Sequence, residues 1–311
     1  MKALFRRPWF GPFAALVAVY VLFAVLSPET FARATNLVTM TRQTVVVAIA
    51  AVGMTLVIVH GGIDLSVGSG VALATVVIAS LLKSGHGPLA ACLAGVGALG
   101  AAGVATGLFV TRLRIAPFIV TLGGMSILRG AAKGLANEQK IDVDPQGLDL
   151  LLGPAEHGLF PPGVWIAVGV ALAAGAALRY TRFGRHVFAV GSNEATARLC
   201  GIDVDRVRVA VYGIAGLLAG LAGVMEFSTL TVGDPTDSIG LELEVIAAVV
   251  IGGASLSGGE GTIAGSMVGA FLMTVIKTGG THLGLPNWVQ EIVTGSIILV
   301  AVALDRARAK K

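Results

Sequence analysis

Long apolar runs alternate with short polar segments along almost the whole chain. An α-helix needs about 20 consecutive apolar residues to cross the hydrocarbon core of a bilayer, and most of the runs approach this length. Glycines interrupt the end of the eighth run, which makes it a poorer simple span than the others. The pattern predicts ten membrane-spanning helices, at residues 12–27, 44–60, 66–83, 88–110, 117–136, 162–180, 208–228, 243–256, 262–281 and 286–304. We therefore expect an all-α integral membrane protein with glycine-interrupted segments.

One polar, glycine-rich stretch occurs twice. Residues 61–70 and 252–261 share the frame Gly-Gly-x-x-Leu-Ser-x-Gly-x-Gly. Paired glycine-interrupted segments in two parts of a transporter point to its solute pathway, because a broken helix leaves backbone groups free to face a polar solute. An ionisable group inside a membrane is usually functional. The candidates for the pathway are the carboxylate and hydroxyl groups of the two copies, Asp64, Ser66, Ser69, Ser255 and Ser257. An alternative is that Asp64 only caps a helix in a tight turn, with help from Ser66.

Composition supports the membrane assignment. Of the 311 residues, 55% are hydrophobic and 13% are charged, whereas soluble domains carry about 25% charged residues. Because the spans consume most of the chain, we expect residues 1–311 to form a single transmembrane domain. The basic residues are spread among the loops between spans, so they do not indicate nucleic-acid binding. Cys92 and Cys200 give neither a disulfide framework nor a metal-ligand spacing.

The N-terminal segment has two interpretations. Basic residues precede the apolar run 13–26, and residues 32–34 read Ala-Arg-Ala, a combination that resembles a signal peptide with its cleavage site. The polar residues 27–29 separate the run from that site, so we favour an uncleaved first span.

Lysine and arginine residues lie mainly on one side of the predicted topology. With ten spans and a cytoplasmic N-terminus, fifteen of the 22 lysines and arginines fall on the cytoplasmic side and seven on the other. Short cytoplasmic loops are enriched in these residues. We therefore expect both termini and the segment at about 181–207 in the cytoplasm, and the loop at about 137–161 outside.

The segment 181–207 contains the signals of one short helix. Asn193 is a suitable N-cap, Glu194 suits the first turn, and Gly201 is a natural stop. Such a helix presents Ala195 and Leu199 on one side, and a small exposed apolar face suits docking to a soluble partner. An alternative is a helix that lies flat on the membrane.

Several signatures of catalysis do not occur in the sequence. There is no Gly-x-x-x-x-Gly-Lys-Ser/Thr loop for a nucleotide, no His-Glu-x-x-His, no Cys-x-x-Cys and no Gly-x-Ser-x-Gly. The sequence therefore predicts no catalytic site, no metal site and no cofactor in this chain.

Several stretches together resemble a known family. They are residues 51–58 leading into 61–69, then 117–126, Phe183-Gly184-Arg185 with 193–202, 246–253 and 290–295. They are spread over most of the chain and occur in the family's order. The chain resembles the membrane permease subunits of bacterial ATP-binding-cassette importers for monosaccharides, the ribose-type group within the branched-chain amino acid/ribose permease superfamily.

The resemblance implies a ten-span subunit of the bacterial inner membrane that pairs with a second permease copy as a homodimer. It also implies a cytoplasmic ATP-binding subunit and a periplasmic sugar-binding protein as partners. In the family, the segment that corresponds to 194–201 docks the ATPase. Thr121, in the matching stretch 117–126, joins the candidates for the substrate pathway. Thr196, Glu244 and residues 277–280 depart from the family pattern, which leaves the identity of the sugar open.

Two other functions are alternatives to a permease subunit. A stand-alone secondary carrier would need an embedded ion-coupling site and would transport without any ATPase. A membrane enzyme that uses Asp64 as an acid or base would need an exposed paired carboxylate, which we do not find in the sequence.

Overall fold

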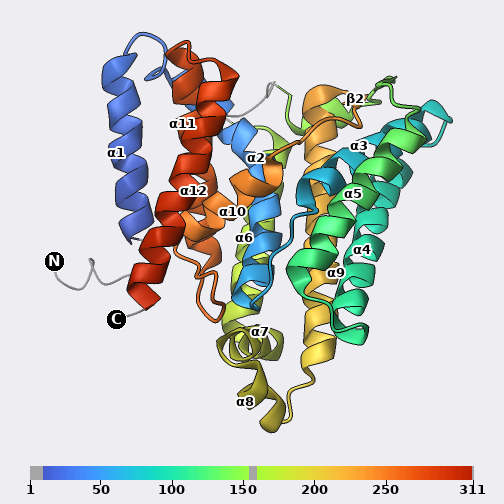
Figure 1. Ribbon diagram of the computed structural model, residues 1–311. Coiled ribbons are helices and arrows are strands. Elements are labelled where there is room, and N and C mark those ends of the chain that lie inside the picture. The colour runs from blue at the N-terminus through green and yellow to red at the C-terminus, as the bar shows by residue number, and fades with distance from the viewer. Residues whose placement is uncertain (1–9, 154–159, 310–311) are drawn as a thin grey trace.

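The computed structural model describes residues 10–153 and 160–309 of the chain. In these ranges it contains twelve α-helices, one short 3-10 helix and one pair of two-residue antiparallel strands, and the long helices lie side by side (Figure 1). The helices are α1 Phe10–Leu26, α2 Ala34–Val59, α3 Val67–Lys83, α4 Pro88–Arg112, α5 Pro117–Leu135, α6 Pro162–Tyr180, α7 Arg182–Ser192, α8 Glu194–Leu199, α9 Val204–Leu230, α10 Leu241–Ile251, α11 Ile263–His282 and α12 Asn287–Ala309. The remaining elements are β1 Ile141–Asp142, η1 Leu148–Leu151 and β2 Val232–Gly233.

The expectation of an all-α architecture is confirmed, and a helix occupies the position of each of the ten predicted segments. Five helices, α2, α4, α6, α9 and α11, are long and apolar enough to cross a membrane. Three shorter apolar helical segments, 11–26, 67–83 and 287–303, accompany them.

The helix ends differ from the prediction where polar residues continue a helix or glycine stops one. α2 begins ten residues before the predicted start at 44. The hydroxyl groups of Thr39 and Thr41 donate to carbonyl oxygens one turn earlier, at distances of 3.1 and 2.8 Å, so these polar residues fit within the helix. α10 ends at Ile251 rather than at 256, because Gly253 has a φ of +94° and closes the helix.

The segment 181–207 contains two helices, so the expectation of a single short helix there is wrong. α8 is the predicted helix, and α7 precedes it. Thr181 starts α7, since its hydroxyl oxygen accepts a hydrogen bond from the amide of Gly184 at 3.2 Å. The sequence pattern gave no apolar run to indicate α7, because its buried positions, Gly184, Val187 and Val190, are few.

Close helix packing depends on glycine where α4 meets α9. A Cβ atom on Gly103 would overlap the carbonyl oxygen of Tyr212, and one on Gly216 would overlap that of Leu99. Gly220 approaches the backbone of Val96 in the same way. The two helices therefore pack backbone against backbone, as small-residue faces allow in a membrane.

The predicted outer loop, 137–161, is tied to neighbouring elements at several points. β1 pairs with β2, with Ile141 opposite Gly233. The guanidinium group of Arg42 on α2 donates to the carbonyl oxygen of Leu152 at 2.6 Å. Residues 154–159 of this loop, like the basic residues before α1, lie outside the described residues.

Candidate functional site

The first copy of the repeated stretch is an extended segment between α2 and α3, visible in Figure 1 as unwound chain. Gly61 has a φ of +93°, and the amides of Gly61 and Gly62 donate to the carbonyl oxygens of Ile58 and Val57 at the end of α2. Residues 62–66 then pass through the interior to the start of α3. Non-helical backbone at membrane depth occurs where protein or a cavity surrounds it.

Asp64 holds the end of this segment. One of its carboxylate oxygens accepts hydrogen bonds from the amide of Ser66 at 2.8 Å and from the Ser66 hydroxyl at 2.6 Å. Asp64 and Ser66 are both buried, whereas Ile63 and Leu65 are half-buried and pack against the apolar core. Asp64 thus closes a turn onto Ser66, the residue that precedes α3, and its carboxylate is buried.

Thr121 and Ser69 lie close to this turn. The Thr121 hydroxyl on α5 donates to the carbonyl oxygen of Ile63 at 3.2 Å, and the side chain is fully buried. Ser69 is buried in the first turn of α3. The structure therefore brings four of the predicted pathway residues, Asp64, Ser66, Ser69 and Thr121, into one region between α3 and α5.

The second copy also has a glycine that ends the helix and a side chain that closes the following turn, but the spacing between the two differs. Gly253 ends α10, with the amides of Gly253 and Ala254 donating to Val250 and Val249. The Ser255 hydroxyl then accepts from the Ser257 amide at 3.3 Å, as Asp64 accepts from Ser66. Two residues separate Gly61 from Asp64, but only one separates Gly253 from Ser255. The turn therefore occupies the same position of the repeated frame in both copies, whereas the helix ends one residue later in the second copy.

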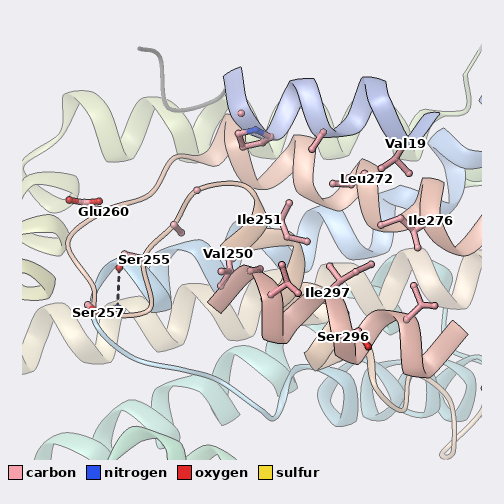
Figure 2. A pocket seen from close by; sticks show the side chains of 18 of the residues that line it. Val19, Val250, Ile251, Ser255, Ser257, Glu260, Leu272, Ile276, Ser296 and Ile297 are labelled. Atoms are coloured by element: carbon pink, nitrogen blue, oxygen red, sulfur yellow. Dashed lines mark hydrogen bonds between the residues drawn. The ribbon is translucent and has the colours of Figure 1, made fainter. Parts of the chain in front are cut away.

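Ser255 and Ser257 line a cavity of about 850 Å³ between α1, α10, α11 and α12, shown in Figure 2. Glu260 lies at the same end of the cavity as the two serines, and Ser296 lies further along α12. The rest of the wall is mainly apolar, with side chains such as Ile251, Leu272, Ile276 and Ile297. The structure therefore places these two serines apart from the Asp64 group.

The two copies meet at a cluster of glycines that we call the glycine junction, consisting of Gly61, Gly191, Gly258 and Gly259. The amide of Gly259 donates to the carbonyl oxygen of Val59 at the end of α2, at 2.8 Å. A Cβ atom on Gly191 of α7 would overlap that same oxygen, and one on Gly258 would lie 3.0 Å from the Cα of Gly61. The end of α7 thus touches both broken segments.

The predicted docking residues lie on α8 and the turn that follows it. The Asn193 side chain accepts from the Thr196 amide at 2.9 Å, which confirms it as the N-cap. Gly201 has a φ of +80° and ends the turn. Ala195 is exposed and Leu199 is 89% exposed, so the predicted apolar face is open on the described surface.

Ion pairs fix α8 against the start of α9. Glu194 pairs with Arg198 at 3.0 Å and with Arg208 at 2.7 Å, and Arg198 also pairs with Asp205 at 2.8 Å. Partial burial by itself would raise the pKa of Glu194, but the hydrogen bonds from Arg198 and Arg208 outweigh it and lower that pKa below its ordinary value. Glu194 therefore stays ionised and holds both arginines.

A second polar region escaped the sequence analysis. A cavity of about 550 Å³ lies between the start of α2, the end of α9, the loop before α10 and the second half of α11. Its wall includes Gln43, Glu226, Glu244, Lys277 and Thr278. One signal for this cavity was available in the sequence, namely the polar segment 34–43. The apolar pattern placed it before the second span, although it forms the first turns of the same helix.

Apolar helices of membrane-spanning length, two broken segments in the interior and a polar cavity between helices are the features of a multi-pass membrane transport protein. A family model described as "Branched-chain amino acid transport system / permease component" matches residues 36–302. The chain belongs to this family of permease components, which are transport subunits rather than enzymes.

The curated relatives match the chain over nearly its full length. The ribose import permease protein RbsC of Escherichia coli (strain K12) is 42% identical over 99% of this chain and 97% of the relative. RbsC of Bacillus subtilis (strain 168) is 36% identical over 96% and 92%. The L-arabinose ABC transporter permease protein AraH of Azospirillum brasilense is 37% identical over 95% and 88%. No solved structure matches the chain.

Proposed function

We propose that this chain is the membrane-spanning permease subunit of a bacterial ATP-binding-cassette importer for a monosaccharide, ribose or a related sugar. The observation that carries the proposal is the similarity to ribose import permeases over 99% of the chain. The arabinose permease, similar over 95%, supports the wider class of pentose-like sugars. A periplasmic binding protein delivers the sugar, and a separate cytoplasmic subunit binds and hydrolyses ATP.

The topology that we propose uses the helices at the ten predicted positions and forms a single permease domain over residues 1–311 in the inner membrane. Both termini and α8 lie in the cytoplasm, and the loop 137–161 lies outside. The charge distribution of the sequence supports this orientation. Cysteine labelling from either side tests it, since a cysteine at position 194 should react only from the cytoplasm and one at 149 only from outside.

We propose that the ATPase docks on α8 through Ala195 and Leu199. The high exposure of Leu199 supports this, because a large apolar side chain at 89% exposure suits an interface with a partner. Asn193, Glu194 and Gly201 hold the helix in place through the cap, the ion pairs and the closing turn. α7 directly precedes α8, and its contact at the glycine junction connects the proposed docking surface on α8 to both broken segments.

The substrate pathway is proposed to follow the broken segments, with a second copy of the chain beside them. Asp64 and Ser66 hold the first segment extended so that its backbone is available to a polar solute, and Ser69 and Thr121 flank it. Ser255 and Ser257 perform the corresponding role in the second segment. Weak polar contacts suit a permease because tight binding of the sugar would slow its release.

Uptake of radiolabelled ribose and arabinose tests the function directly. Cells receive the permease together with its partner ATPase and binding protein, or with the ATPase omitted. We expect uptake that requires all three proteins. Uptake that persists without the ATPase would show a stand-alone carrier instead, and the proposal would be wrong.

A further inference from the structure

The 550 Å³ cavity, which we call the outer cavity, lies at the end of the molecule opposite α8. Its volume falls within the range of about 300–1,000 Å³ that small-molecule sites occupy. Five separate elements, α2, α9, the loop before α10, α10 itself and α11, contribute to its wall. A space of this size and composition between packed helices calls for a polar occupant.

The wall offers hydrogen-bond donors and acceptors of several kinds. Gln43 contributes an amide, and the Thr278 hydroxyl donates to the side-chain oxygen of Gln43 at 3.3 Å. Lys277 pairs with Glu244 at 3.4 Å, and Glu226, half-buried, lies beside Asp237 in the same wall. Acidic and basic groups share one wall, so neither an anion nor a cation is favoured. Neutral hydroxyl groups, which donate and accept at once, suit such a lining.

The floor and side of the outer cavity are held in place. The hydroxyl of Thr44 donates to that of Thr274 at 2.9 Å and links α2 to α11 below the cavity. Every residue of α2 from Thr44 to Val59 is buried. On the side, the guanidinium of Arg129 donates to the carbonyl oxygens of Pro235 and Asp237 at 2.9 and 2.7 Å and fixes the loop before α10. The site is therefore preformed and closed toward α8.

The outer cavity also adjoins the first broken segment. Ser238 belongs to its wall, and a Cβ atom on Gly68, in the first turn of α3, would overlap the Ser238 carbonyl oxygen. Gly68 comes two residues after Ser66, at the end of the extended segment. Only the loop that contains Ser238 thus separates a solute in the outer cavity from the proposed pathway.

We propose that the outer cavity is a binding site for a neutral monosaccharide, occupied when the sugar enters the permease and before it passes the broken segments. Gln43, Glu226 and Thr278 are the residues that we assign to contact with its hydroxyl groups. This inference rests on the proposed function, since it assumes that the chain carries a sugar.

The first test measures uptake of a panel of ribose, arabinose and glucose by the complete importer. The variants are Gln43→Leu, Glu226→Gln and Thr278→Val, and the matched control is Thr41→Val. Thr41 lies on the same part of α2, but its hydroxyl bonds to the Leu37 carbonyl within the helix. We expect the maximal uptake rate to fall about three- to tenfold for each cavity variant, as the loss of one hydrogen bond predicts. The control should transport like the wild type at equal abundance.

The second test measures protection by the sugar and separates a binding role from a structural one. Cys92 and Cys200, the two cysteines of the chain, are replaced by serine, and Thr278→Cys or Thr41→Cys is introduced. The purified complex of permease and ATPase reacts with a charged thiol reagent, with or without the sugar that the wild type transports. We expect the sugar to slow the labelling of position 278 at least about threefold and to leave position 41 unchanged.

The outcomes distinguish the two proposals. If the wild type takes up no sugar of the panel, the proposed function fails and the sugar site fails with it. If sugar is transported but the cavity variants behave like Thr41→Val, the importer stands and the outer cavity is not its sugar site. If uptake falls without protection of position 278, the residues act only on the structure, and the site proposal is overturned.

Discussion

Replacing Gly191 by alanine is a direct test of the glycine junction. The added methyl group would overlap the carbonyl oxygen of Val59 and would lie 2.7 Å from the amide nitrogen of Gly259, whereas non-bonded carbon contacts are optimal at about 3.5–4.0 Å. Both neighbours are backbone atoms and cannot rotate away. The end of α7 must therefore shift, and the 2.8 Å hydrogen bond between Gly259 and Val59 is pushed apart.

The magnitude follows from three contributions. Overpacking costs about 1–3 kcal/mol, and the disrupted backbone hydrogen bond adds about 1–3 kcal/mol. Helix propensity acts in the opposite direction, because alanine is favoured over glycine by about 1 kcal/mol inside a helix. We expect the Gly191→Ala permease to be less stable by about 1–5 kcal/mol. Its ATPase should drive less uptake, because the end of α7, which leads into α8, is displaced from the broken segments.

Thermal unfolding of the purified permease and ATP-driven uptake measure the two effects. The matched control is Gly169→Ala on α6, where a Cβ atom would meet nothing within 4 Å. That variant keeps the gain in helix propensity without the clash, so it should melt no lower than the wild type. Equal melting temperatures for the two variants, together with equal uptake, would refute the role that we assign to the junction.

Three further predictions concern the turn and the docking helix. Asp64→Ala leaves the amide and hydroxyl of Ser66 without an acceptor, at about 1–3 kcal/mol each, so it should abolish uptake, whereas Asp64→Asn keeps an acceptor and should only impair it; normal uptake by the alanine variant at normal abundance would contradict this. Gly201→Val forces a φ of +80° on a branched residue at about 1 kcal/mol or more and should reduce co-purification of the ATPase, while full co-purification would count against docking at α8. The lowered pKa of Glu194 means that its pairing is complete above the ordinary glutamate pKa of about 4.3 and is lost only as the pH falls through the lowered value. Co-purification should therefore stay constant from about pH 8 to about pH 5, and a decrease in that range would show that another group controls docking.

Local pattern was sufficient to predict most of the helices and the cap of α8. Apolar runs located a helix at each of the ten predicted positions, and Asn193 and Gly201 took the roles that their chemistry indicates. These features depend on residues that are neighbours in the sequence. The repeated frame also predicted two broken segments, and both copies have a turn closed by the side chain at the same position of the frame, Asp64 and Ser255.

Features that depend on contacts between distant segments could not be predicted in this way. The outer cavity joins Gln43 to Thr278, which are 235 residues apart, and its polar residues looked like the frayed ends of spans. Nor could the sequence show which cavity each copy faces: Ser255 and Ser257 line a mainly apolar cavity whose wall does not include Asp64. The one-residue shift at the helix ends is likewise invisible in the sequence, since it depends on where each helix stops.

The backbone contact between α4 and α9 has a mechanical consequence. Ion pairs fasten α8 to the first turns of α9, and a helix of 27 residues is about 40 Å long. Because α4 and α9 are locked together, they would tilt as one stiff lever, and a tilt of about 5° at the α8 end would displace the opposite end by about 3.5 Å. Glu226 and Thr229 sit at that opposite end, in the wall of the outer cavity. With the docking that we propose, a small movement of the ATPase would become a displacement about as large as one side chain at the far end of α9.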